Sequence, residues 1–499
     1  MSETLMPLAI LLPFVGSLIC FVSRHRVSVF TGCVTALLTA GTIGWLTYDV
    51  AIHGVQVYAL GGWSAPLGIH LRVDGLALFM MIMSAIVGVA VTFYAVSYFG
   101  EHDAQEEKRG AELFWPIWMF LWASMNALYL SGDIFNIYVI LEILGLAAVG
   151  LVALTGRRAV LVAGMRYLLA AMAGSLIYLL GVVLLYAAHG TVDIVLLGQA
   201  IEPGATAMAA MTVMTAGLLL KTAMFPLHFW LPPAHASATA PVSAILSALV
   251  VKASFYLILR LWFDVFHATI TLEAGYVMGA LGTGAILWGS IQALRQARVK
   301  MMIAYSTVAQ LGYLFFVFPV SADHDAANAA TWISIAGQGS LYQALAHALA
   351  KTSIFLSAGV LLHAAGSDHI DHMRGLAQRL PVTVFAMALA GVSLMGLPPS
   401  GGFVAKWMTV QAVLAAGQWW WAPVIIGGGL LAAGYIFRIL RPAFSPADVQ
   451  EALHPVPRSL ELCALGMAIL SIVIGLRATD LLDVLLIGAP FAIQAGGAL

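Results

Sequence analysis

Residues 206–233 read TAMAAMTVMTAGLLLKTAMFPLHFWLPP. The first half of this stretch is an apolar run of the kind that crosses a membrane as an α-helix, for which ~20 mostly apolar residues are needed. A lysine, Lys221, stands inside the run, and Pro226 and Pro232-Pro233 follow it. Proline removes a main-chain hydrogen bond from a helix, and broken backbone survives in lipid only where protein buries it or where it lines a wet cavity. The stretch therefore predicts a broken membrane helix beside a polar site.

The composition of the whole chain identifies its solvent. Of the 499 residues, 62% are hydrophobic and only 9% are charged, whereas soluble domains are about 25% charged. So few charges cannot cover a surface that faces water, so we expect the chain to lie in a lipid bilayer. The net charge of −1 excludes nucleic-acid binding, which needs a basic face. The cysteines Cys20, Cys33 and Cys463 stand singly in apolar runs, so we expect no disulfide and no metal role.

Apolar runs long enough to span a membrane recur along the chain. We predict fourteen spans, near residues 4–22, 28–48, 74–98, 113–131, 134–154, 164–187, 206–227, 241–262, 273–293, 302–319, 331–363, 382–416, 420–437 and 459–476. A further apolar stretch follows at 481–498. The N-terminus lacks the basic region of a cleaved signal peptide, so we expect the first run to be a transmembrane helix of the mature chain. With no long polar linker in the sequence, we expect one all-α polytopic membrane domain.

Basic residues in the loops predict the orientation of this bundle, because short loops rich in Lys and Arg face the cytoplasm. The loops after odd-numbered spans contain Arg24, Arg26, Lys108, Arg109, Arg157, Arg158, Arg166, Arg295, Arg298, Lys300, Arg374, Arg379, Arg438, Arg441 and Arg458. The opposite side contains Arg72, Arg260 and Arg477. We therefore predict a bacterial-type inner (plasma) membrane protein with its N-terminus outside and, for an even number of spans, its C-terminus outside too.

Four lysines and one acid stand inside the spans: Lys221, Lys252, Lys351, Lys406 and Glu142. Each embedded lysine costs about 2.5–3.5 kcal/mol on insertion scales. One lysine near the end of a span usually extends back to the interface, but four together with a lone acid indicate a function. Arginine keeps its proton in proteins, whereas a buried lysine can release it. We interpret the lysines as a proton relay along one lateral axis, with Glu142 and Lys221 as a buried acid–base pair near mid-membrane.

Several histidines accompany these charges. His347 and Lys351 are four residues apart, so they share a helix face and can exchange a proton; a satisfied core histidine is the alternative. His228 and His235 flank the first proline break, where they can bridge helices or hold the loosened backbone. Three further histidines lack a metal-ligand spacing, and we interpret their segment as a solvated loop. They are His363, His369 and His372.

A second break, Gly396-Leu-Pro-Pro-Ser-Gly-Gly402, precedes Lys406, whereas the first break follows Lys221. Interrupted helices in corresponding halves of a chain point to a transport site built from inverted repeats. The sequence contains no P-loop, no HExxH and no nucleotide fingerprint. We therefore expect no cofactor and no metal, and an energy source in an ion gradient or a partner.

Motifs over nearly the whole chain support a family resemblance. They are Leu60-Gly-Gly-Trp, Val73-Asp-Gly-Leu-Ala-Leu, Glu142, Phe225-Pro-Leu-His-Phe-Trp-Leu-Pro, Ala240-Pro-Val-Ser-Ala, Lys300-Met-Met-Ile-Ala-Tyr-Ser-Thr-Val-Ala-Gln-Leu-Gly-Tyr, His347 with Lys351, and Gly396-Leu-Pro-Pro-Ser-Gly-Gly-Phe-Val-Ala-Lys. On these motifs the chain resembles the proton-translocating, antiporter-like membrane subunits of respiratory complex I, membrane-bound hydrogenases and Mrp-type cation/proton antiporters. Its compact length is most similar to the D subunit of the Mrp-type multisubunit antiporters, although Phe229-Trp-Leu-Pro-Pro-Ala-His departs from the patterns of both branches.

The resemblance implies a fourteen-helix core with two inverted five-helix repeats, helices 4–8 and 9–13, in which helices 7 and 12 are discontinuous. We accordingly expect one transmembrane domain over 1–499, with N-terminal helices in 1–112, a first repeat in 113–262, a second repeat in 273–440 and a C-terminal helix region in 455–499. Family members work in hetero-oligomers. The implied partners are other membrane subunits, protons, Na⁺ and the lipid bilayer.

For the site, the resemblance implies that Glu142 pairs with Lys221 and that Lys252 bridges toward the bundle centre. Either His347 or Lys351 takes the helix 11 position, and Lys406 ends the polar axis. The function expected from this site is proton translocation within a monovalent cation (Na⁺)/proton antiporter. A proton-pumping subunit of a complex I-like dehydrogenase or a membrane-bound hydrogenase is the alternative, since it uses the same relay. A scaffold that transports nothing is a third class, but it predicts a nonpolar interior, which the four lysines contradict.

Overall fold

The computed structural model describes residues 2–100, 105–323, 328–446 and 453–492, with the main chain alone for residues 2–3 and 105–109. The side chains of Lys108 and Arg109 and the end of the predicted C-terminal region, residues 493–499, lie outside this part.

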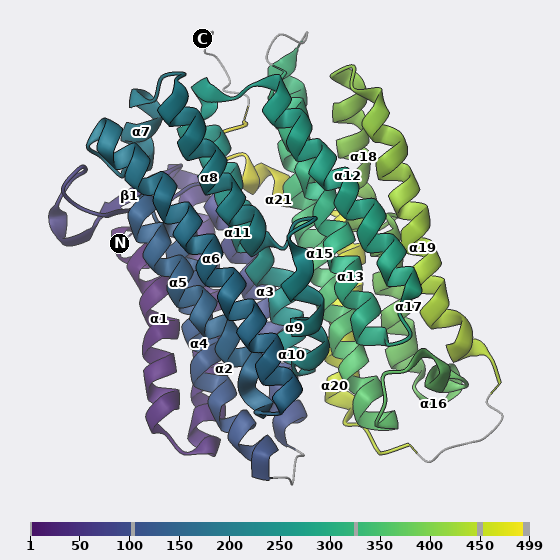
Figure 1. The fold of residues 1–499 in the computed structure, drawn as a ribbon. Helices are drawn as coiled ribbons and strands as arrows, with labels where there is room; N and C mark the ends of the chain where they lie inside the picture. Colours follow the sequence, from purple (N-terminus) through teal and green to yellow (C-terminus); the bar gives the residue numbers. More distant parts are fainter. Residues whose placement is uncertain (1, 101–104, 324–327, 447–452, 493–499) are drawn as a thin grey trace.

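Helices form nearly all of the described chain (Figure 1). The α-helices are α1 (Ser2–Val22), α2 (His25–His53), α3 (Gly75–Gly100), α4 (Gln105–Leu130), α5 (Ile134–Val152), α6 (Arg158–His189), α7 (Ile194–Ala200), α8 (Ala205–Thr222), α9 (Leu231–Ser237), α10 (Ala240–Ile245), α11 (Val251–Arg260), α12 (Leu272–Arg295), α13 (Val299–Gly312), α14 (Val317–Ser321), α15 (Ala329–Ala365), α16 (Leu376–Arg379), α17 (Pro381–Met395), α18 (Gly401–Ala415), α19 (Ala422–Phe444), α20 (Arg458–Leu476) and α21 (Ala478–Leu485). Short 3-10 turns are η1 (Leu60–Gly62), η2 (Ala153–Thr155), η3 (His228–Trp230), η6 (His267–Thr269), η7 (Tyr313–Phe316), η8 (Ile370–Met373) and η9 (Trp419–Trp421), and the π-helical turns are η4 (Leu246–Val250) and η5 (Leu261–Val265). A small antiparallel hairpin pairs β1 (Gln56–Ala59) with β2 (His70–Val73).

The helices reproduce the predicted spans. Among the described residues, thirteen helices are long and apolar enough to cross a membrane, and they coincide with thirteen of the fourteen predictions. The remaining prediction, 382–416, corresponds to α17 and α18 together. The expected all-α polytopic fold is therefore confirmed.

Two segments form the centre of the bundle. The apolar window of Ala240–Val265, which contains α10 and α11, is completely buried by protein, and that of α15 is 94% buried. The corresponding windows of α1, α2, α19 and α20 are only 33% buried, so these helices are peripheral. In Figure 1, α15 lies between the helices of the first half and those of the second. Helix α4 begins at the lower end of the view and α12 at the upper end.

The first predicted break is confirmed, but it begins earlier than the prolines suggested. Helix α8 ends at Thr222, and Ala223 adopts a left-handed conformation with φ 57°. The main-chain N–H of Met224 then donates to the carbonyl of Leu219 at 3.0 Å, which closes the helix end. Pro232 lies in the first turn of α9, where proline lacks only an N–H that would have had no helical partner. The prolines therefore start the second half of the broken helix and do not end the first.

The second break is also confirmed. Helix α17 ends at Met395, and Gly396 at φ 79° provides the left-handed residue that closes it. Helix α18 restarts at Gly401, capped by the Ser400 hydroxyl oxygen, which accepts from the N–H of Phe403 at 3.2 Å. The last carbonyls of α17 are left without helical partners, and they become part of the site described below.

Two features were not predicted from the sequence. The π-helical turns η4 and η5 flank α11 within the fully buried central helix. At the C-terminal end, α21 spans only eight residues, so the apolar stretch predicted at 481–498 forms no further span within residues 478–492. The carbonyl of Ile487 instead accepts from the N–H of Gly75 at 2.6 Å, which holds this end against the start of α3.

Candidate functional site

Lys221 lies on the last turn of α8, beside α5. Its side chain is 7% exposed, and its Nζ donates to the carbonyl of Leu141 at 3.2 Å. The close approach of α8 to α6 depends on Gly217, where a Cβ would overlap the main-chain oxygen of Gly174. Two facing glycines thus let the main chains approach and set the position of Lys221.

Glu142, the residue after Leu141, is half-buried, whereas the sequence suggested deep burial. Its Oε1 is inaccessible and has no hydrogen-bond partner among the described residues. The structure brings Glu142 and Lys221 close enough for their charges to interact, but no ion pair within 4.0 Å joins them in the described part of the chain. Their pairing through an intervening water stays a prediction.

Lys252 is completely buried on the first turn of α11, directly after η4. Its Nζ donates to the carbonyl of Ser247 at 2.7 Å, within the π turn. The hydroxyls of Ser247 and Thr307 are 2.9 Å apart, and the Thr307 hydroxyl donates to the carbonyl of Ile303 at 3.1 Å. The π turn thus connects the central lysine to α13.

Lys351, also completely buried, reaches the same turn of α13 from α15. Its Nζ donates to the carbonyl of Ile303 at 2.7 Å and forms a second hydrogen bond with the Ser306 hydroxyl. Lys351 therefore contacts this turn of α13 directly, whereas Lys252 is linked to it through Ser247. The carbonyl of Ile303 accepts from both the Thr307 branch and Lys351.

His347 lies one turn before Lys351 on α15 and is 1% exposed. Both ring nitrogens are inaccessible, and neither has a hydrogen-bond partner among the described residues. No direct hydrogen bond therefore joins His347 to Lys351 there, although the two lie on the same buried helix. His347 is close enough to Lys252, Lys351 and Lys406 for the charges of all three to act on its ring.

Lys406 binds the main-chain carbonyls that have no helical partner at the second break. Its Nζ donates to the carbonyl of Leu394 at 2.8 Å and to that of Met395 at 3.3 Å. It also lies 4.3 Å from the ring centroid of Tyr313, a cation–π contact. The broken end of α17 therefore solvates a buried ammonium group.

Two glutamines, missed in the sequence, connect Lys406 to the bundle centre. The amide of Gln310 on α13 donates to the carbonyl of Leu394 at 3.1 Å, the same oxygen that binds Lys406. Its own Oε1 accepts from Gln343 on α15 at 2.9 Å. Lys252, Lys351 and Lys406 are thus all linked to α13, and no described hydrogen bond extends this network to Lys221. The signal that would have found the glutamines is the presence of two amide side chains inside mostly apolar predicted spans.

The two histidines beside the first break are both buried. His235 is 0% exposed, its ring lies against that of Phe355 on α15 at 5.0 Å, and both nitrogens lack partners among the described residues. His228 lies 5.9 Å from the ring of Phe225 and 6.4 Å from that of Tyr305. His235 therefore bridges α9 to α15 as expected for a histidine that joins helices, and it faces the bundle centre.

Lys300 was predicted to lie in a basic loop, but the structure places it in a helix. The residue belongs to the first turn of α13 and is 4% exposed. Its Nζ donates to the carbonyl of Ala238 at the end of α9. A fifth lysine is therefore buried beside the first broken helix. The boundary error arose because the adjacent Arg295 and Arg298 are exposed.

Arg260 was assigned to the loops on the outer side, but the structure places it inside a helix. It ends α11 and is 5% exposed. Its guanidinium makes a bidentate pair with the fully buried Asp74, a 3.0 Å pair with Asp264 and a 2.9 Å hydrogen bond to the Tyr256 hydroxyl. Burial opposes ionisation of Asp74, but the guanidinium outweighs it and holds the pKa of that carboxyl below its usual range. We call Asp74, Arg260 and Asp264 the outer ion cluster.

A second ion pair lies nearby, between His70 Nδ1 and Asp193 at 2.8 Å. Burial opposes the charge of Asp193, but the hydrogen bond from His70 lowers the pKa of that carboxyl. No group of three His, Cys, Asp or Glu side chains placed to hold a metal ion occurs among the residues that the structure describes.

Comparisons with known proteins place this geometry in a family. Residues 131–431 match the family described as NADH:quinone oxidoreductase/Mrp antiporter, TM. NADH-quinone oxidoreductase subunit N of Desulforudis audaxviator is 35% identical over 80% of this chain and 78% of its own length. The D subunit of the Na⁺/H⁺ antiporter of Bacillus subtilis is 29% identical over 94% of this chain and 93% of its own.

A solved structure supports the fold. A chain of the Mrp complex from Dietzia sp. superposes with a TM-score of 0.87 at 21% identity, covering 98% of this chain and 97% of that one. The matched segment contains Glu142, the first break, the π turns, all of α13 and α15, and the second break with Lys406. The chain therefore belongs to the NADH:quinone oxidoreductase/Mrp antiporter family of transmembrane subunits.

Proposed function

We propose that this chain is the proton-translocating subunit of a multisubunit Na⁺/H⁺ antiporter. The observation that carries the proposal is that three buried lysines are connected to α13. Lys351 contacts the helix directly, Lys252 is linked to it through Ser247, and Lys406 is linked to it through Gln310. These lysines meet carbonyl and hydroxyl dipoles and no carboxylate within the described residues. Such partners hold an ammonium group without fixing its charge, so each lysine can release its proton.

The proposed mechanism passes protons laterally. Glu142 and Lys221 exchange a proton at one end of the axis, and Lys406 does so at the other. Between them, Lys252 and either His347 or Lys351 carry charge across the centre, with His228 and His235 in supporting positions. Because like charges at close range disfavour one another, protonation of one lysine favours proton release from the next. This coupling would link loading at one end to release at the other.

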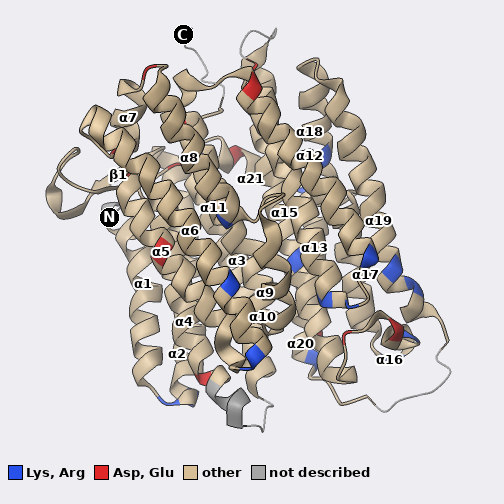
Figure 2. Cartoon of the chain, viewed as in Figure 1, with Lys and Arg blue, Asp and Glu red and all other residues tan. Residues whose placement is uncertain are grey.

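We also propose the orientation and the division of the chain. Most basic residues lie in the lower half of the view in Figure 2, which supports a cytoplasmic lower end by the positive-inside rule. Helix α1 runs toward that end, so the N-terminus lies outside a bacterial plasma membrane, and an even number of spans puts the C-terminus outside too. The inverted repeats occupy 113–262 and 273–440. Residues 1–112 and 455–499 flank them, and other membrane subunits complete the complex.

A proton-pumping subunit of a redox complex is the second candidate. Its specific support is the 35% identity to subunit N of the quinone oxidoreductase, against 29% to the antiporter subunit, although the antiporter match covers more of the chain. Identification of the subunits that co-purify with this chain separates the two. Small antiporter subunits favour the first function, and iron–sulfur subunits favour the second.

The function is tested with Glu142→Ala and Lys221→Ala in the intact complex. Both variants should abolish Na⁺-dependent proton movement in everted membrane vesicles while the complex still assembles, because the end of the relay loses its proton acceptor. The matched control is Glu112→Ala, which removes an exposed acid from α4 and should leave exchange unchanged. Normal exchange in either relay variant would count decisively against the proposal.

A further inference from the structure

A cavity of about 410 Å³ lies between the two halves of the bundle, at the end that contains Arg157 and Arg298. Its wall is formed by the ends of α3 and α15, by the turn between α5 and α6, by the segment that joins α9 to α10, and by the start of α13. Ligand sites in proteins commonly have volumes of ~300–1,000 Å³. The cavity is therefore large enough for a small ligand or a lipid headgroup.

The described wall of this cavity contains cationic side chains. Arg157, Arg298 and Lys300 line it, and no described lining residue is Asp or Glu. Arg298 is matched by Asp368, whose carboxylate accepts from its Nε at 2.8 Å. Lys300 donates to the main-chain carbonyl of Ala238, and the charge of Asp368 acts on it as well. A ligand with negative charge would complement this wall.

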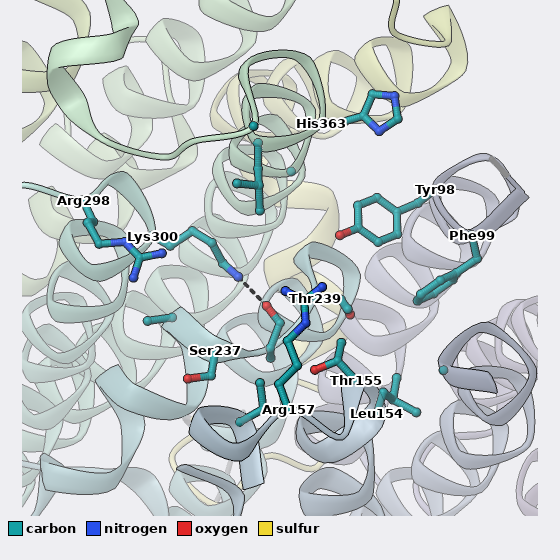
Figure 3. A pocket seen from close by; sticks show the side chains of 17 residues that line it. Tyr98, Phe99, Leu154, Thr155, Arg157, Ser237, Thr239, Arg298, Lys300 and His363 are labelled. Atoms are coloured by element: carbon teal, nitrogen blue, oxygen red, sulfur yellow. Dashed lines mark hydrogen bonds between the residues drawn. The ribbon is translucent and has the colours of Figure 1, made fainter. Parts of the chain in front are cut away.

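Two hydroxyl groups in the wall point to the same ligand chemistry. The Oγ1 atoms of Thr155 and Thr239 are inaccessible and have no hydrogen-bond partner among the described residues, although nearly all buried polar side chains in proteins have one. Both threonines line the cavity. Figure 3 shows the side chain of Arg157 extending between them, with Lys300 approaching from the other side. Two hydroxyl donors and two cations therefore converge on one volume.

We propose that this cavity binds the phosphate group of an acidic phospholipid. Phosphate oxygens accept charge-assisted hydrogen bonds from guanidinium and ammonium groups, and they accept from hydroxyl donors as well. Basic pockets between transmembrane helices on the cytoplasmic side bind such headgroups. The apolar side chains of Phe99, Leu154 and Leu362 in the same wall favour a lipid over free phosphate, because a glycerol backbone would cover them.

The proposed lipid has a structural consequence that goes beyond proton translocation. Its phosphate would connect the turn between α5 and α6 to the segment between α9 and α10, and so fasten the first broken helix. The proposed orientation of the chain decides only to which leaflet of the bilayer the lipid belongs. The site itself does not depend on that orientation.

The test compares Arg157→Gln with Arg158→Gln in the intact complex. Arg158 is the neighbouring arginine. Both arginines are exposed, but Arg158 is absent from the wall, and its substitution removes the same charge. The complex is reconstituted in phosphatidylcholine vesicles that contain spin-labelled phosphatidylglycerol, and the immobilised fraction of the probe is measured. Arg157→Gln should lower the affinity for the labelled lipid, read from the immobilised fraction, about tenfold, as expected for a lost hydrogen bond to a charged group. Arg158→Gln should leave this affinity unchanged.

A second arm distinguishes the source of the phosphate. Inorganic phosphate is titrated against the complex in detergent at constant ionic strength, and thermal unfolding is followed. Thr239→Val removes a hydroxyl and keeps the side-chain volume. If the site binds phosphatidylglycerol, this variant should lower the immobilised fraction of the labelled lipid; if it binds inorganic phosphate, it should reduce the thermal stabilisation by phosphate. Stabilisation by phosphate without selectivity for phosphatidylglycerol would overturn the lipid assignment in favour of a soluble anion. Equal behaviour of Arg157→Gln, Thr239→Val and the unsubstituted complex in both arms would overturn the site.

Discussion

The outer ion cluster and the lysine axis both bury charge in the same bundle, but they do so in opposite ways. Arg260 meets two carboxylates and a hydroxyl, so its charge is neutralised in place. Lys252 and Lys406 meet only the dipoles of carbonyl groups at helix irregularities, besides one aromatic ring. A fully paired arginine cannot exchange its proton and serves as an anchor. A lysine that is held only by dipoles can release its proton and bind it again.

The largest effect should follow from breaking the outer ion cluster. Asp74→Asn leaves Arg260 without its bidentate partner, and removal of one member of a buried pair costs about 3–5 kcal/mol. Unfolding of the purified complex in detergent measures this loss. Because the pKa of Asp74 is lowered, its contribution is complete at neutral pH and is lost as the pH falls through that lowered value.

A double substitution provides the control for this prediction. Asp74→Leu with Arg260→Met removes both members of the bidentate pair and should be less destabilising than Asp74→Asn alone, since the buried guanidinium is not left without that partner. The charges that then lose a partner, Asp264 and Arg72, are both partly exposed. If the single variant is as stable as the unsubstituted protein, the cluster is not an anchor.

The next effect should come from Lys252→Arg and Lys406→Arg. Each keeps the positive charge but removes its ability to release a proton, so Na⁺/H⁺ exchange should fall ~100-fold, the order of a lost proton-transfer group. Assembly, followed by co-purification of partner subunits, should be retained. Lys406→Gln is the control for a steric effect of the larger guanidinium. It also removes the group that releases a proton, but it adds no bulk, so exchange should fall in this variant too.

The comparison is sharpened by Arg260→Lys in the outer ion cluster. This variant should lower stability but leave exchange per assembled complex unchanged, because Arg260 is not a member of the proposed relay. Full exchange in both Lys→Arg variants would make those lysines structural cations and remove the distinction between the two regions.

The smallest effect should follow from Ser247→Ala or Thr307→Val. Each deletes the hydroxyl contact between the π turn and α13, and a single neutral hydrogen bond contributes about 0.5–1.5 kcal/mol. A severalfold slower exchange rate in reconstituted vesicles is expected. The matched control is Ser353→Ala on α15, whose buried hydroxyl lacks a partner among the described residues. A slower rate in the control but not in Ser247→Ala would show that this contact does not support the relay.

Much of the fold was predictable because lipid imposes one rule on every span. Runs of ~20 apolar residues must form helices, and Gly396 marks the end of α17 through a backbone conformation that glycine favours. The end of α8 was predicted less accurately, because the residue with the left-handed backbone conformation there is Ala223 and not a glycine. Proline therefore located both breaks, but the first residue of the first break was not predicted.

The site was predictable in its residues and not in its connections. Lys252 and Lys406 stand out because charge is rare in apolar spans, but their carbonyl partners are main-chain atoms that any residue type supplies. Arg260 was missed because its partner Asp74 is 186 residues away, so no local pattern shows that its charge is neutralised. Lys300 was missed because two exposed arginines precede it.

The π-helical turn η4 has a consequence for how the sequence of this chain can change. A π turn contains one residue more than the α-helix it interrupts, and one residue corresponds to ~100° of rotation about the helix axis. Everything after Leu246–Val250, Lys252 included, is therefore rotated relative to the start of the same helix at Ala240. Point substitutions in α10 leave this angle unchanged, whereas a deletion of one residue would turn Lys252 away from α13. The azimuth of the central lysine is thus encoded by the length of a segment and not by the identity of any residue in it.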